Sequence, residues 1–82
     1  MFLQSVDQPV FVVLVFDATR GGVAVAGKRL ADSEKAAVRM AERLAQSRAG
    51  ACAFARTSEH DEPIELARYG TVPHHLPDIL GS

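Results

Sequence analysis

The sequence lacks several features that would each place it in a familiar class of proteins. It contains one cysteine, Cys52, so no internal disulfide can form, and a secreted scaffold held together by disulfides is excluded. Its longest apolar run, residues 10–16, is far shorter than the roughly 18–20 residues of a transmembrane helix. The first residues carry no basic segment, and Asp7 and Pro9 interrupt the apolar stretch, so we expect no signal peptide.

The composition that remains is that of a small globular domain. Of the 82 residues, 48% are hydrophobic and 23% are charged, which excludes wholesale disorder. We expect a single domain over residues 1–82, with a lead-in over 1–8, a folded core over 9–73 and a loosely ordered tail over 74–82. The lone thiol and the lack of a targeting signal predict a cytoplasmic protein, and the excess of arginine over lysine is typical of a bacterial one.

The most informative segment is the apolar run of residues 10–16, which is rich in β-branched and aromatic side chains. Its length and composition predict a strand. Because side chains alternate between the two faces of a strand, and both sets are apolar here, we predict a central strand with packing on each side. A turn over residues 17–22 and a second strand over 23–26 complete a predicted hairpin.

The middle of the chain predicts a helix followed by two more strands. Residues 32–34 are a helix-start signal, and the apolar periodicity over 33–49 predicts a helix that ends at Gly50 and contacts the sheet mostly through alanine. Residues 51–57 predict a strand with small residues on one side and with Cys52 and Phe54 on the other. Residues 64–69 predict a last strand. The fold class is therefore α+β, in the order ββαββ, with a mainly antiparallel four-stranded sheet and one helix on one face.

The apolar first strand also predicts self-association. One helix covers one face of such a sheet, and large apolar side chains on the other face are costly to leave in water. We therefore expect a homodimer in which a second copy covers the open face, with another protein as the alternative partner. The candidate dimer surface is one of two sets, because the sequence does not show which face the helix covers: Phe11, Val13 and Val15, or Val10, Val12, Leu14 and Phe16.

The charge is uneven, although the net charge is only −1. Residues 18–56 carry eight basic and three acidic side chains (+5), whereas residues 57–82 carry one basic and five acidic (−4). Lys35, Arg39 and Arg43 recur every four residues and form a basic ridge on the helix, with Lys28 and Arg29 just before it. Such a ridge can bind phosphates, and nucleic-acid binding is the alternative function, against which stand the net charge of −1 and the few aromatic side chains. The competing interpretation is that the ridge pairs with acidic side chains of the same chain or of another subunit: Glu59, Asp61, Glu62 and Glu65.

Three patterns suggest a phosphate-binding loop, a catalytic cysteine and a zinc site, but each lacks neighbouring residues that such a site requires. Residues 22–28, GVAVAGK, match part of a phosphate-binding loop, but the next residue is Arg29 where Ser or Thr should stand, and the intervening residues favour a strand. No histidine lies near Cys52 in the sequence to activate its thiol. The three histidines, His60, His74 and His75, lack the paired spacing of zinc ligands. We expect no enzymatic activity, no cofactor and no metal site.

Four segments carry a resemblance to known proteins: residues 32–37 (DSEKAA), 41–45 (AERLA), 50–57 (GACAFART) and 66–73 (LARYGTVP). Together they resemble a group of short, uncharacterised proteobacterial proteins. No activity is assigned to that group, so the resemblance implies no functional residue. The sequence as a whole favours a self-associating interaction or accessory module without catalytic activity and without membrane contact. A third hypothesis is a small-molecule pocket between the helix and the sheet or between subunits.

Overall fold

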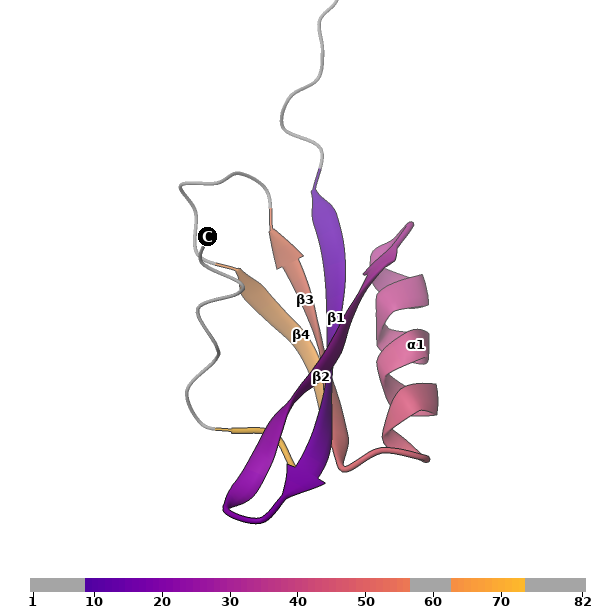
Figure 1. The fold of residues 1–82 in the computed structure, drawn as a ribbon. Coiled ribbons are helices and arrows are strands. Elements are labelled where there is room, and N and C mark those ends of the chain that lie inside the picture. The colour runs from indigo at the N-terminus through magenta and orange to yellow at the C-terminus, as the bar shows by residue number, and fades with distance from the viewer. Residues whose placement is uncertain (1–8, 57–62, 74–82) are drawn as a thin grey trace, which may run out of the picture.

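A computed structural model describes residues 9–56 and 63–73, which form one sheet and one helix (Figure 1). In chain order the elements are β1 (Val10–Thr19), β2 (Gly22–Ala31), α1 (Glu34–Ala45), β3 (Gly50–Arg56) and β4 (Ile64–Gly70). The four strands lie in the order β2-β1-β3-β4, and each neighbouring pair is antiparallel. The predicted α+β class, the order ββαββ and the single helix on one face are confirmed. The predictions for residues 1–8, 57–62 and 74–82 lie outside the described residues.

Strand β1 is central, as its two apolar faces predicted. It pairs with β2 on one side and with β3 on the other, so its backbone groups find partners along both edges. Its five residues from Val12 to Phe16 are at most 5% exposed. The sheet is therefore organised around the most apolar segment of the chain.

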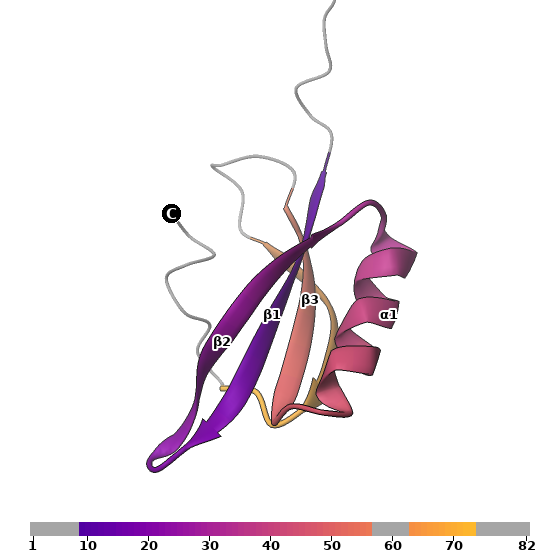
Figure 2. The same ribbon diagram turned by 45° about the vertical axis from the view of Figure 1, so that its right-hand side comes forward.

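Helix α1 begins where the sequence indicated. The Ser33 side chain accepts a hydrogen bond from the backbone N–H of Ala36 at 3.1 Å, which satisfies one of the free donors at the helix start. The helix lies on one side of the sheet (Figure 2), where it buries Ala37 and Ala41. Among the described residues, no helix is long and apolar enough to cross a membrane.

The helix ends earlier than predicted, and Gly50 has a different role. Helix α1 stops at Ala45 rather than at residue 49, with Gln46 as its cap. Gly50 is the first residue of β3 and is fully part of the sheet, paired with Gly70. A Cβ atom at Gly50 would collide with the backbone of Thr71. This glycine therefore allows two backbones to approach closely, rather than ending the helix.

Strand β2 is much longer than the four residues predicted for it. It runs from Gly22 to Ala31, so residues 27–31, which were interpreted as a connection, pair with β1 instead. The pairing skips Ala26, because Gly27 faces Val15 of β1 and Val25 faces the next residue along it. This β-bulge shifts the alternation of side chains halfway along the strand. The predicted turn over 17–22 is correspondingly shorter, since β1 continues to Thr19.

Candidate interaction surfaces

The side of the sheet opposite α1, called here the helix-free face, carries a compact apolar cluster. Its members come from the central strands β1 and β3, and each is between 0 and 5% exposed: Val12, Leu14, Phe16, Cys52 and Phe54. Val23 of β2 and Val72, which follows β4, pack against them. The prediction that Cys52 and Phe54 share one side of the third strand, opposite its small residues, is confirmed.

The structure decides which of the two candidate dimer surfaces faces the helix. Phe11 and Val13 belong to the cluster beneath α1. Val15 comes two residues after Val13 on the same strand, so its side chain also points toward the helix. The other set, Val10, Val12, Leu14 and Phe16, lies on the helix-free face.

The expectation that the face of β1 opposite the helix is exposed without a second subunit is wrong. Of the set on the helix-free face, only Val10 is exposed, at 49%, whereas Val12, Leu14 and Phe16 are buried within the single chain. The face of β1 opposite the helix is therefore not bare, and burial of this strand alone does not require a partner. The homodimer itself stays a prediction.

Exposed apolar side chains nevertheless gather at the border of the helix-free face. Leu30 pairs with Val12, and Val25 pairs with Phe16, so both point to this side of the sheet. Leu30 is 67% exposed, Val25 is 37% exposed, and Val10 lies diagonally across from Leu30. We call Val10, Val25 and Leu30 the apolar rim. Sequence reasoning missed two of these three residues. Val25 lies in the predicted strand over 23–26, which was assigned no face, and Leu30 lies in residues 27–31, which were interpreted as a connection.

The five basic residues named as nucleic-acid contacts divide between the two faces. Arg29 pairs with Val13 and therefore points to the side of the helix, whereas Lys28 pairs with Leu14 and points to the helix-free face. All five are exposed: Lys28, Arg29, Lys35, Arg39 and Arg43. Within the described residues, none of them forms an ion pair. The structure thus places Arg29 on the same side of the sheet as the helix ridge and Lys28 on the opposite side.

One acidic residue proposed to neutralise the ridge pairs elsewhere. Glu65 accepts two hydrogen bonds from Arg68, the shorter of them at 2.7 Å, next to Cys52 on the helix-free face. This contact lowers the pKa of Glu65 and raises that of Arg68. Glu65 is therefore not the counter-charge of the ridge. The other three candidates, Glu59, Asp61 and Glu62, lie outside the described residues.

The Cys52 thiol is unsuited to nucleophilic chemistry. Burial raises its pKa to about 12, and the nearby Glu65 carboxylate adds to this effect while Arg68 opposes it. The thiol is therefore protonated at neutral pH, and the thiolate is the reactive form. In the part of the chain that the structure describes, no three potential metal ligands lie together. The glycine-rich residues 22–28 are part of strand β2 rather than a phosphate-binding loop.

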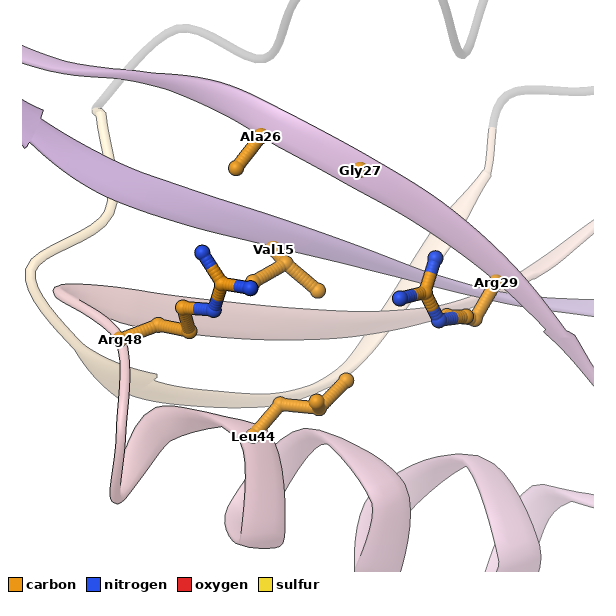
Figure 3. Close-up of a pocket in the computed structure, with 6 residues that line it drawn as sticks. All are labelled: Val15, Ala26, Gly27, Arg29, Leu44 and Arg48. Atoms are coloured by element: carbon orange, nitrogen blue, oxygen red, sulfur yellow. The ribbon is translucent and has the colours of Figure 1, made fainter.

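A small pocket opens between β2 and the C-terminal end of α1 (Figure 3). Val15 and Leu44 form its apolar part, and the Arg29 and Arg48 side chains stand on either side of them. Arg48 is held there by an ion pair with Asp17 at 2.7 Å. The pocket has a volume of about 20 Å³, far below the roughly 300–1,000 Å³ of typical ligand sites. It therefore offers little support for the small-molecule hypothesis.

Comparison with known proteins adds no functional information to this geometry. No protein-family model, curated protein or solved structure matches the chain. The resemblance to short proteobacterial proteins stays a prediction.

Proposed function

We propose that this protein is a small interaction module that associates with a second copy of itself through its helix-free face. The observation that carries the proposal is the apolar rim. Of the four large hydrophobic side chains that are exposed in the described residues, three lie on this face: Val10, Val25 and Leu30. The rim borders an apolar cluster that the single chain already buries, so the apolar surface left for a partner on this face is the rim itself.

The energetic argument rests on symmetry. Fully burying an exposed aliphatic side chain contributes about 1.5–3 kcal/mol, and the rim residues, which are 37–67% exposed, would contribute the corresponding part of it. In a two-fold symmetric dimer every rim residue is buried twice, once in each subunit. Val10 and Leu30 are diagonal neighbours, so two copies can bring four such side chains together at one place.

Association through the face is favoured over pairing of strand edges. Strand β2 is one edge of the sheet, but it contains a bulge and the adjacent cations Lys28 and Arg29. Strand β4, at the other edge, also has a bulge and carries Glu65 and Arg68. Bulges and charges are the means by which edge strands avoid pairing with another chain. Both edges are therefore poor templates for continuing the sheet.

A binding role also fits the chemistry of the described residues. The single thiol is buried and protonated, and the residues that resemble a phosphate-binding loop form a strand. We therefore propose a module that acts by contact rather than by catalysis. A cytoplasmic location, where a lone thiol stays reduced, is part of the same proposal.

Light scattering during size-exclusion chromatography tests the proposal. We expect the protein to be a dimer and Leu30→Asp to shift it to the monomer. Ile64→Asp is the matched control, because Ile64 is 61% exposed but pairs with Ala55 on the helix side. A protein that is monomeric at all concentrations would refute self-association. Equal loss of the dimer in both variants would refute its assignment to the helix-free face.

A further inference from the structure

The residues that the structure describes carry a net positive charge, although the net charge of the whole chain is −1. Residues 9–56 and 63–73 contain nine basic and five acidic side chains, a net charge of +4. The whole chain has a net charge of −1, so the remaining residues contribute −5. Three of the five acidic side chains outside the described residues, Glu59, Asp61 and Glu62, come between β3 and β4 in the sequence, and Asp7 and Asp78 lie toward its two ends. The net charge of the whole chain therefore does not show where on the described surface an anion is attracted.

Four exposed cations lie on the helix side of this domain, and we call them the basic surface: Arg29, Lys35, Arg39 and Arg43. The three helical residues are four apart, which places each about 6 Å along the axis from the next. Arg29 joins them from β2, at the pocket that Leu44 of α1 also lines (Figure 3). Cations from two different elements thus border one side of the molecule.

The basic surface lacks compensation within the described residues. Helix α1 also carries Glu34 and Glu42, but neither forms an ion pair with a member of the surface. Like charges four residues apart on a helix repel each other. Glu65, the acidic residue of β4, is engaged by Arg68 on the opposite face. A row of uncompensated cations is the arrangement that an extended polyanion neutralises.

We propose that the basic surface binds the phosphate backbone of double-stranded nucleic acid, without reading its sequence. A membrane surface is a poorer partner, because the apolar side of α1 is packed against the sheet and is not free to enter lipid. Single strands are usually bound by stacking of their bases on exposed aromatic rings. The aromatic side chains of the described residues are buried or half-buried: Phe11, Phe16, Phe54 and Tyr69. Contact with the phosphates of a duplex is what this surface offers.

The neighbouring residues Lys28 and Arg29 provide a matched test. Both are exposed and both lose one positive charge on replacement by glutamine, but they point to opposite faces of the sheet. We would measure binding of the wild type, Arg29→Gln and Lys28→Gln to a fluorescent mixed-sequence DNA duplex by anisotropy, with potassium chloride varied from about 50 to 200 mM. Circular dichroism of each variant checks that the fold is intact.

The expected results follow from counterion release. For four phosphate contacts, log K should fall with log salt concentration with a slope of about −3.6, so affinity should drop on the order of 100-fold across this range. Arg29→Gln should make the slope shallower by about 1, while Lys28→Gln should leave it unchanged. An Arg39→Gln, Arg43→Gln double variant should make it shallower by about 2.

Three results would overturn the proposal. The first is absence of wild-type binding to the duplex at about 50 mM salt and protein concentrations up to about 100 μM, the weak end of non-specific affinity. The second is an equal effect of Lys28→Gln and Arg29→Gln, which would indicate attraction by overall charge rather than by one face. The third is clearly tighter binding of a single strand than of the duplex. The dimer proposed above involves the other face, so its failure would leave this test unaffected.

Discussion

The two faces of the sheet are built from side chains of different size. Of the five largest fully buried side chains, four lie on the helix-free face: Phe16, Phe54, Leu14 and Cys52. The helix side has Val13 as its one member of that group, and the other fully buried side chains of its cluster are alanines from α1 and β3. The face that carries the helix is therefore the face with the small side chains.

This difference shows that the two faces of a sheet can be buried in different ways, one by packing a helix against small side chains and the other by packing large apolar side chains together. Alanine lets the backbones of α1 and β3 approach closely, but each alanine buries little area. The large rings of Phe16 and Phe54 bury much more, without a helix against them. We infer that loss of a single fully buried side chain costs most on the helix-free face, and that the helix side is the more sensitive to added volume.

The largest expected effect comes from emptying the helix-free face. Phe16→Ala removes a ring that is 0% exposed and should lower the free energy of unfolding by about 3–5 kcal/mol. Val13→Ala, on the helix side of the same strand, removes fewer atoms and should cost clearly less. Urea denaturation of both variants measures the comparison, and Phe16→Leu replaces Phe16→Ala if the latter does not fold. Equal losses at the two positions would contradict the inferred difference between the faces.

An intermediate effect is expected from adding volume on the helix side. Ala41 is 0% exposed beneath α1, so Ala41→Leu should force the helix away from the sheet and cost about 1–3 kcal/mol. Ala36→Leu is the control, because Ala36 lies in the same helix but is only half-buried. Thermal unfolding followed by circular dichroism compares the two. If Ala36→Leu is as destabilising as Ala41→Leu, close packing of the helix against the sheet is not the cause of the lost stability.

A third effect is absent at neutral pH and appears only in alkaline solution, where the stability of the helix-free face depends on the Cys52 thiol. The pKa of the Cys52 thiol rises from 9.0 to about 12 on folding. The unfolded chain therefore loses this proton first, so the contribution to stability is complete below pH 9 and is lost as pH rises toward 12. Between these values the loss amounts to about 1.4 kcal/mol per pH unit.

Comparison with Cys52→Ala isolates this dependence. The two proteins share every other side chain, so a difference between their pH dependences reports on position 52. Urea denaturation at several pH values above 9 should show a steeper loss of stability in the wild type than in the variant. Parallel curves would mean that the thiol ionises as readily in the folded protein as in the unfolded chain.

The parts of the fold that could be predicted from the sequence are those with an uninterrupted local signal. The apolar run of β1 indicated a central strand, and Ser33 with its acidic neighbour indicated the start of α1. In β3, the alternation of alanine with Cys52 and Phe54 separated its two faces correctly. In each case the residues that determine the element are neighbours in the chain.

The parts that could not be predicted depend on contacts between distant segments. The bulge at Ala26 shifts the alternation of β2, so no single periodicity covers the whole strand, and its second half was interpreted as a connection. That Gly50 serves a close backbone approach follows from the position of Thr71, twenty-one residues later. Likewise, the burial of Phe16 on the face without a helix is a property of the folded chain and not of its local pattern.

The candidate surfaces likewise contain features that follow from the local sequence and features that depend on strand pairing. The basic ridge of α1 was predicted because helical spacing fixes its direction, but the opposite orientations of Lys28 and Arg29 depend on the pairing of β2 with β1. The apolar rim could not be assembled without the same pairing. Leu30 gives no distinctive signal in the sequence, because single apolar residues are common on protein surfaces.

The bulge in β2 also determines how the gene for this protein can change in length. Since Ala26 is the residue that the pairing skips, losing its codon leaves Val25 and Gly27 opposite the same partners as before. Losing a codon between Gly27 and Ala31 would instead shift the following residues by one position, or force the connection to α1 to shorten. In this part of β2, deletion of Ala26 therefore leaves every other side chain on the same side of the sheet. A strand with or without this residue can present the same side chains on each face.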